Sequence, residues 1–229
     1  MLSRVLEPEL MDTDQDAREY DAMDHAAVNA AFATDFMEAV TDWSPKRPVQ
    51  SDESSLLTVL DLGAGTGQIP IELCRHDPQI RIVAVDAAAS MLAVARQNIT
   101  AAALTNRISP FLADAKQLPF PDHSFQAVIS NSILHHVAEP AQVLAEAVRV
   151  AEPEALQFHR DLCRPADEAE LARLVGLYAG DATEYQRRLF AESLRAALTL
   201  EEIQTLVEQL GFRRDTVAMT SDRHWTWAV

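Results

Sequence analysis

Residues 56–75 read LLTVLDLGAGTGQIPIELCR, an apolar run that ends at three closely spaced glycines and is followed by a helical pattern. The apolar run predicts a strand over 56–62. The chain has six glycines, and three of them, Gly63, Gly65 and Gly67, stand at this turn. Glycines at a strand-to-helix turn permit positive φ and let a ligand lie against bare backbone, beside the free N–H groups of the helix. The stretch therefore predicts an α/β fold with a ligand site at the turn.

The sequence after this turn alternates short apolar runs with helical stretches, which predicts a parallel sheet with helical crossovers. Further strands are expected over 80–85, 108–112, 127–130 and 156–161. Helices are expected over 69–75, 90–100 and 141–150. Two last extended pieces, 216–220 and 224–229, predict an antiparallel hairpin at the edge of the sheet. The predicted fold class is α/β, a doubly wound sheet of the Rossmann type.

The remaining segments are helical in pattern. Residues 1–50 form an acidic helical preface, and residues 51–229 carry the α/β pattern with a helical insertion over 165–195. Thr199 and Glu202 form a capping box for one further helix, which ends before Gly211. The sequence therefore predicts one structural domain.

Composition excludes several classes of protein. With 35 acidic against 19 basic residues, the formal charge of −16 opposes a polyanion, so we expect no nucleic-acid partner. The two cysteines and seven histidines show no metal-like spacing, so we expect no metal and no disulfide framework. The chain shows no export signal and no uncharged apolar run of 18 residues, which predicts a cytoplasmic protein without a membrane span.

Spacing separates the ligand classes that use a glycine-rich turn. The dinucleotide pattern Gly-x-Gly-x-x-Gly fails because Gln68 takes the third glycine position, and no Gly-Lys-Ser/Thr of a Walker loop follows. Asp86 ends the second predicted strand, 19 residues after Gly67, where a carboxylate accepts hydrogen bonds from ribose hydroxyls.

Four motifs carry a resemblance to a known family. VLDLGAGTGQIPIELC and RIVAVDAAASML resemble the first two motifs of class I S-adenosylmethionine-dependent methyltransferases. ADAKQLPFPDHSF resembles their adenine-binding segment, and AVISNSILHHVAEP resembles the segment after the fourth strand in the ubiquinone/menaquinone-biosynthesis-like branch. The resemblance spans residues 59–161 and departs before the fifth strand, where Ala151-Glu-Pro-Glu-Ala155 replaces a glycine-containing turn.

The resemblance implies the cofactor and the strand order. The cofactor would be S-adenosylmethionine, with S-adenosylhomocysteine as product, and the seven strands would run 3-2-1-4-5-7-6 with the last pair antiparallel. Asp61 would contact the methionine amino group, Asp86 the ribose, Asp114 the adenine amino group, and Asn131 would lie beneath the sulfonium. The full expected cofactor set is Asp61, Gly63, Ala64, Gly65, Thr66, Gly67, Asp86, Ala87, Met91, Asp114, Ala115 and Asn131.

Methyl transfer from a sulfonium is an in-line displacement, so most of the rate comes from alignment. A base is needed only for an acceptor that arrives protonated. His135 and His136 are the expected bases, since the ends of strands in open α/β sheets face the ligand crevice. Asp161 ends the fifth predicted strand and could also reach the acceptor. A histidine at the start of a helix, satisfied by backbone groups, is the alternative.

Other residues are candidates for the acceptor side. Related enzymes fold an N-terminal helix over the cofactor, so residues 1–50 are expected to form a lid that includes Tyr20 and His25. A solvated helix face is the alternative. Arg164 could reach the acceptor or form a surface ion pair. Trp225 and Trp227 lie on one face of a strand by their spacing, either as ordinary packing or as a pocket wall.

The predicted function is transfer of a methyl group to a small-molecule acceptor by a monomer or homodimer. A methyltransferase of RNA or protein is the first alternative; the −16 charge opposes RNA. A cofactor-binding subunit without its own activity is the second alternative.

Overall fold

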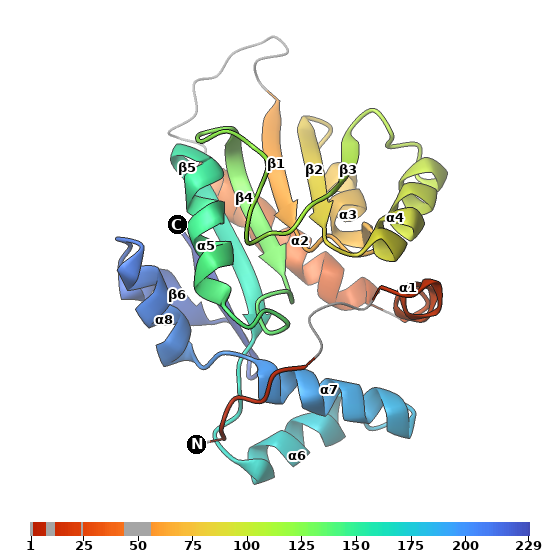
Figure 1. The fold of residues 1–229 in the computed structure, drawn as a ribbon, viewed down its shortest axis with the longest axis vertical. Coiled ribbons are helices and arrows are strands. Elements are labelled where there is room, and N and C mark those ends of the chain that lie inside the picture. Colours follow the sequence, from red (N-terminus) through yellow and green to blue (C-terminus); the bar gives the residue numbers. More distant parts are fainter. Residues whose placement is uncertain (1, 8–11, 24, 44–55) are drawn as a thin grey trace.

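Within residues 2–7, 12–23, 25–43 and 56–229, which the computed structural model describes, seven strands form one sheet in the order β3-β2-β1-β4-β5-β7-β6 (Figure 1). β1 to β5 are parallel, and β7 pairs antiparallel with both β5 and β6. The strands are β1 Leu57–Leu62, β2 Ile80–Asp86, β3 Ile108–Leu112, β4 Phe125–Asn131, β5 Ala151–Leu162, β6 Val217–Met219 and β7 His224–Ala228. The expected strand order and the antiparallel last pair are confirmed.

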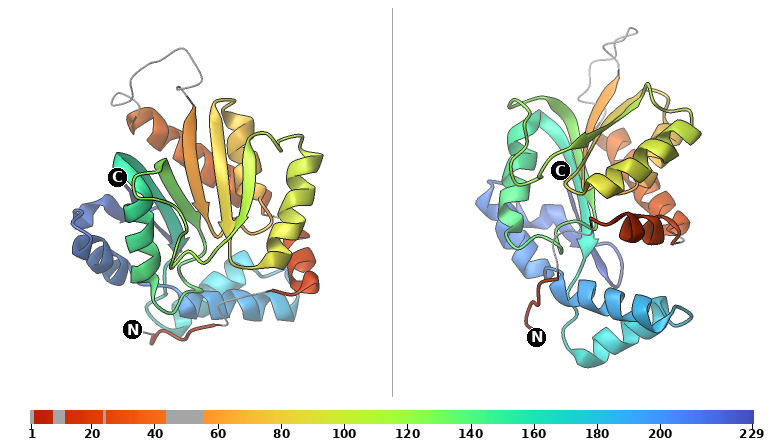
Figure 2. Two further views of the ribbon diagram at one scale, coloured as in Figure 1. Left: turned by 45° about the horizontal axis from the view of Figure 1, so that its top comes forward. Right: turned by 45° about the vertical axis from the view of Figure 1, so that its right-hand side comes forward.

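Helices cover both faces of the sheet, which gives three layers (Figures 1 and 2). One face carries α2 Ala26–Trp43, α3 Gln68–His76 and α4 Ala89–Ala101, and the other carries α5 Pro140–Val150 and α8 Leu200–Gln209. Successive side chains of β1 face opposite sides of the sheet. Val59 packs under α2 and α3, and Leu60 packs under α5. The central strands are therefore apolar on both faces, as parallel strands require.

The second helix, α2, is not part of the lid that was expected over residues 1–50. Phe32, Phe36 and Val40 of α2 are buried, and the rings of Phe32 and Phe36 contact Phe158 of β5 at centroid distances of 5.2 and 5.7 Å. α2 is thus a core helix of the sheet. α1 Asp14–Asp21 remains a candidate lid. The expected boundary between residues 50 and 51 lies outside the described residues.

β5 begins five residues earlier than expected. Ala151 pairs with Phe125 and Leu156 with Ala127, so β5 bulges where the resemblance implies a glycine-containing turn. Glu154 lies in this bulge and adopts a φ of +63°. Its carbonyl oxygen accepts a hydrogen bond of 2.7 Å from Trp43 Nε1.

The polar residues of β5 are paired inside the core. His159 Nδ1 lies 2.9 Å from Ser130 Oγ, and His159 Nε2 lies 2.8 Å from Gln157 Oε1. The imidazole stacks on Trp227 at 5.1 Å. Burial lowers the pKa of His159 to about 3, so the ring is neutral at pH 7. A neutral, hydrogen-bonded network explains how this strand carries polar side chains in a buried position.

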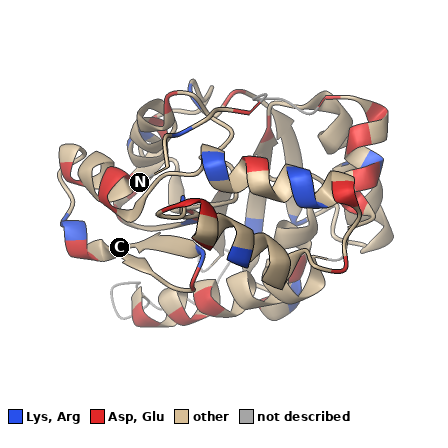
Figure 3. Ribbon diagram, turned by 90° about the horizontal axis from the view of Figure 1, so that it is seen from below, with Lys and Arg blue, Asp and Glu red and all other residues tan. Residues whose placement is uncertain are grey.

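The expected insertion over 165–195 folds into α6 Glu168–Tyr178 and α7 Glu184–Ala196, which lie beyond the carboxyl ends of the parallel strands (Figures 1 and 2). Seen from this side, both acidic and basic positions lie on the helices (Figure 3). The short helix η3 Arg214–Thr216 precedes β6. Among the described residues, no helix has the length and apolar character needed to cross a bilayer.

Candidate active site

The glycine turn after β1 has the conformation that its sequence predicts. The φ values of Gly63, Gly65 and Gly67 are +71°, +54° and +79°. A Cβ on Gly63 would also lie 2.6 Å from Ile133 Cδ1, so the close approach of the loop after β4 requires glycine there. Gly67 caps α3, and the first N–H groups of a helix have no partner within the helix.

Asp61, at the end of β1, is the most conspicuous polar group of this edge. Its side chain is buried, and its Oδ2 has no hydrogen-bond partner among the described residues. Burial, followed by repulsion from Asp86, raises the pKa of Asp61 well above its usual value. Thr66 Oγ1 is likewise buried without a partner in the described chain. Both residues line a cavity of about 30 Å³, so the turn offers two buried acceptors to a ligand.

Asp86, at the end of β2, holds the turn in place. Its Oδ2 accepts a hydrogen bond of 2.8 Å from Gly65 N, and its Oδ1 accepts one of 2.8 Å from Ala88 N. Burial raises the pKa of this carboxyl, although the backbone hydrogen bonds oppose the rise. Asp86 lines a second cavity, of about 330 Å³, that adjoins the first through Tyr20, Gly63 and Asn131.

α1 closes this edge from outside (Figure 2). Asp21 Oδ1 accepts hydrogen bonds from Gln68 Nε2 of α3 at 3.1 Å and from Asn98 Nδ2 of α4 at 2.8 Å. Tyr20 lines both cavities, and burial, Asp86 and Asp61 together raise the pKa of its hydroxyl. His25 lines the smaller cavity. The residues expected of a lid therefore do lie over the glycine turn.

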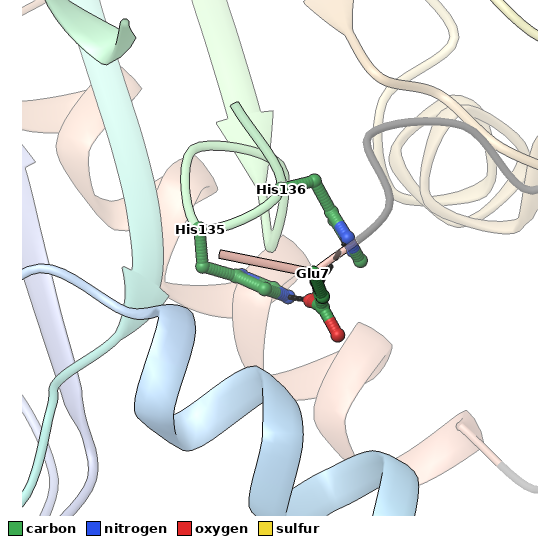
Figure 4. Close-up of side chains that lie close together, drawn as sticks. All are labelled: Glu7, His135 and His136. Atoms are coloured by element: carbon green, nitrogen blue, oxygen red, sulfur yellow. Dashed lines mark ion pairs between the residues drawn. The ribbon is translucent and has the colours of Figure 1, made fainter. Parts of the chain in front are cut away.

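On the other side of Asn131, four residues form what we call the acceptor cluster: Glu7, His135, His136 and Asp161. His135 Nδ1 lies 2.5 Å from Asp161 Oδ1, and His135 Nε2 lies 3.5 Å from Glu7 Oε1. His136 Nδ1 lies 3.0 Å from the same Glu7 oxygen. Both imidazoles point toward Glu7, which comes from the N-terminal segment (Figure 4). His136 lines the 330 Å³ cavity.

The charges of the acceptor cluster support one another. Burial alone lowers the pKa of His135, but the attraction and hydrogen bond of Asp161, together with Glu7, outweigh it and raise the pKa. Burial likewise opposes the lowered pKa values of Asp161 and Glu7, which the histidines cause. Asp161 also accepts hydrogen bonds from Leu134 N, His135 N and Leu162 N at 2.6, 3.2 and 2.6 Å.

Comparison with known proteins identifies the family. A family model described as a methyltransferase domain matches residues 59–154. The chain is 32% identical over 167 residues to the demethylmenaquinone methyltransferase of Porphyromonas gingivalis, which covers 68% of each chain. The chain belongs to the class I S-adenosylmethionine-dependent methyltransferases.

Two further similarities agree with this family. The ubiquinone/menaquinone biosynthesis C-methyltransferase UbiE of Escherichia fergusonii is 29% identical over 167 residues, which span 68% of this chain and 66% of that relative. A solved structure of a SAM-dependent methyltransferase from Aquifex aeolicus is 16% identical, with a TM-score of 0.64 over 94% of this chain and 97% of the other. That structure supports the fold of the methyltransferase. The expected branch of the family and its cofactor, S-adenosylmethionine, are confirmed.

The residues of the methyltransferase fit this cofactor. The unpartnered Asp61 Oδ2 suits an ammonium group, and the ends of β2 and of the loop after β3 present carboxylates to the 330 Å³ cavity. Except for Gly67, every residue expected at the cofactor lines one of the two cavities. They are Asp61, Gly63, Ala64, Gly65, Thr66, Asp86, Ala87, Met91, Asp114, Ala115 and Asn131. Gly67 instead caps the start of α3, and a Cβ there would lie 3.3 Å from Ala95 Cβ.

Three residues expected on the acceptor side have other roles. Trp225 is fully buried in the core between β7 and α8, so the pocket-wall interpretation is wrong and ordinary packing is correct. Arg164 is buried and donates to Ala197 O at 2.8 Å and to Glu202 at 2.6 Å, which ties β5 to α8. Asp161 faces backbone N–H groups and His135, so it positions a histidine and does not reach the cavity.

Two residues of this site escape sequence reasoning. Glu7 lies 128 positions before His135, in a stretch that reads as an acidic preface. Arg4 fastens the same segment: its guanidinium donates to Val137 O at 2.9 Å and to Ala196 O at 2.6 Å. A contact of this range has no local pattern, and the only signal was the presence of a cation and an acid near the start.

Proposed function

We propose that the methyltransferase methylates a small molecule that carries an ionisable hydroxyl, such as a phenol or a quinol. The proposal depends on one observation: His136 lines the 330 Å³ cavity, and its Nδ1 lies 3.0 Å from Glu7 Oε1. S-adenosylmethionine supplies an electrophilic methyl group. The remaining task of the protein is to orient an acceptor and to manage its proton.

On the cofactor side, each residue orients without reacting. Asp61 binds the ammonium group, Asp86 accepts from the ribose, and Asn131 separates the cofactor residues from the acceptor cluster. α1, with Tyr20 and His25, excludes water from the glycine turn. The positions of these residues in the lining of the two cavities support these roles.

On the acceptor side, His136 takes the proton. Donation of Nδ1–H to Glu7 leaves the lone pair on His136 Nε2, which is the form of imidazole that accepts a proton. Asp161 holds His135 in place, and Nε2 of His135 lies 3.5 Å from the same Glu7 oxygen. His135 and Asp161 are therefore positioning residues, and His136 is the group that contacts the acceptor.

The cavity also suggests the kind of acceptor. Ile133, Val137 and Val143 line it beside His136, which suits a flat apolar molecule with a hydroxyl at its edge. The relatives from Porphyromonas gingivalis and Escherichia fergusonii are named for methylation of demethylmenaquinone and for C-methylation in quinone biosynthesis. A reduced naphthoquinone is therefore the first acceptor to offer.

The test uses purified protein, methyl-labelled S-adenosylmethionine and three acceptor pools: a reduced naphthoquinone, a small-molecule extract, and the macromolecules of the same extract. Label in a small molecule, absent with His136→Asn and present with the exposed-histidine control His76→Asn, is the expected result. Label in RNA or protein would replace the proposal with a macromolecular acceptor. Cofactor binding without transfer to any pool would favour a subunit without its own activity.

A further inference from the structure

The acceptor cluster also has the composition of a metal site. We propose that Glu7, His135 and His136 bind a divalent transition-metal cation such as Zn²⁺, with a coordination position left for a ligand from the cavity. The three ligand atoms lie within 4.8 Å of one another. Two histidines and one glutamate form a known ligand set of catalytic zinc, in which a fourth position stays open.

The two distances from Glu7 to the imidazole nitrogens fit a shared cation. Ligands of a tetrahedral zinc, each about 2.0–2.2 Å from the metal, lie roughly 3.4 Å apart. Glu7 Oε1 lies 3.5 Å from His135 Nε2 and 3.0 Å from His136 Nδ1. The two imidazole rings stand side by side, 4.1 Å apart at their centroids, and both face Glu7 (Figure 4). Both distances from Glu7 lie within about half an ångström of the tetrahedral value, and all three ligand atoms lie within 4.8 Å of one another.

A hydrogen bond to Asp161 orients one of the proposed ligands, His135. Histidines that bind metals almost always donate their other ring N–H to a carboxylate or carbonyl. His135 does so to Asp161, at 2.5 Å, and Asp161 is itself fixed by three backbone N–H groups. This contact leaves the lone pair of His135 on Nε2, directed at Glu7. The arrangement is independent of the Glu7 contacts, and it is the one that a bound cation requires.

The lone pairs and negative charges near Glu7 favour a bound cation. If Nδ1 of His135 carries its proton to Asp161, then Nε2 and the Glu7 oxygen present lone pairs to each other at 3.5 Å. A proton or a metal cation between them removes the repulsion. Glu7 and Asp161 together bring two negative charges, and Arg4, whose guanidinium is bound to the carbonyls of Val137 and Ala196, brings one positive charge. A divalent cation would balance this group.

The open position would serve the proposed reaction. Because His136 lines the cavity, a ligand entering from there would reach the cation. This step rests on the proposed function: an acceptor hydroxyl would coordinate through its oxygen, its O–H bond would break, and the proton would pass to solvent water. A cation on His136 Nδ1 and a proton accepted by His136 are alternative states, so cation binding decides which one operates.

The test measures metal binding directly. Protein freed of metal with a chelator, then desalted, is titrated with Zn²⁺ by calorimetry and with Co²⁺ by visible absorption. We expect one equivalent and a Co²⁺ spectrum of low coordination number. Glu7→Gln, which is nearly isosteric, and His136→Asn should each weaken binding at least about 10-fold. Asp161→Asn should weaken it about 10- to 100-fold by freeing His135.

A matched control separates this site from surface binding. His76 Nε2 lies 3.5 Å from Glu72 Oε1 on the exposed face of α3, the same pairing at the same distance without the second imidazole. His76→Asn should leave the affinity unchanged, and thermal unfolding should show that each variant is folded. Equal affinity in wild type and Glu7→Gln, or no binding of Zn²⁺ and Co²⁺ by wild type, would overturn the inference. Transfer of labelled methyl groups to the small-molecule pool by the same metal-free samples reports on the proposed function separately.

Discussion

Two buried aspartates stand at the carboxyl edge of the sheet, Asp61 at the end of β1 and Asp161 near the end of β5, and their surroundings are opposite. Asp161 accepts from three backbone N–H groups and one imidazole, whereas Asp61 Oδ2 has no partner among the described residues. The pKa of Asp61 is raised and that of Asp161 is lowered. A saturated carboxylate belongs to the framework, and an unsaturated one is kept for a ligand.

The largest expected effect comes from removing the carboxylate of Asp161, the aspartate whose oxygens are fully hydrogen-bonded. Asp161→Ala leaves three buried N–H groups and His135 without their acceptor, so the free energy of unfolding should fall by about 3–5 kcal/mol. Urea unfolding measures it. The exposed Asp122, paired with Arg149, is the control, and Asp122→Ala should cost less than about 1 kcal/mol. Equal losses in the two variants would contradict the assignment of Asp161 to the framework.

The second prediction separates binding from stability at Asp61. Asp61→Asn removes the charged acceptor, worth about 1.5–3 kcal/mol, so affinity for S-adenosylmethionine should fall about 10- to 100-fold. The ligand-free protein should be as stable as wild type or more stable, because the variant removes a buried carboxyl group whose Oδ2 has no hydrogen-bond partner among the described residues. Calorimetry and thermal unfolding measure the two quantities. A large loss of stability would make Asp61 a second framework residue and erase the contrast with Asp161.

Sequence reasoning was accurate where one stretch of chain makes the structure. The first three strands, the glycine turn and Asp86 come from a continuous apolar pattern whose side chains meet at neighbouring strand ends. The bulge before Leu156 could not be predicted, because Glu154 adopts a conformation that ordinarily selects glycine. Glu7 was missed for a different reason: only tertiary packing brings it to His135. Trp225 was ambiguous because strand spacing shows a shared face but not which layer covers it.

A third prediction concerns pH. Burial, with Asp86 nearby, raises the pKa of Asp61, so part of the free protein carries a protonated Asp61 below that pKa. An ammonium group favours the carboxylate, so binding releases the proton and affinity falls as pH falls, by at most about tenfold per pH unit. Calorimetry between pH 5 and 7 in buffers of different ionisation enthalpy counts the protons. Asp61→Asn should lose this dependence, and an unchanged proton count would move the linkage to another group.

The smallest expected effect is a change in stability at Glu154, in the bulge at the start of β5. It gives a reference against which the effects at Asp61 and Asp161 can be compared. Glu154→Gly should stabilise the protein by up to about 1 kcal/mol, since glycine adopts a φ of +63° without strain and keeps the carbonyl that Trp43 binds. Glu152→Gly, two residues away in the same strand, should instead cost about 0.5–1 kcal/mol. Neither variant should alter affinity for S-adenosylmethionine. Opposite signs in urea unfolding are the expected outcome.

The position of β7 has a consequence for synthesis. β7 lies between β5 and β6, so the N–H and C=O groups along one side of β5 have no strand partner until His224–Ala228 have left the ribosome. An open edge of this kind invites pairing with other nascent chains. During translation, β1 to β5 therefore emerge before β7 is available to pair with β5. Gln157 and His159 make that open edge more polar than its neighbours, which would slow aggregation during translation.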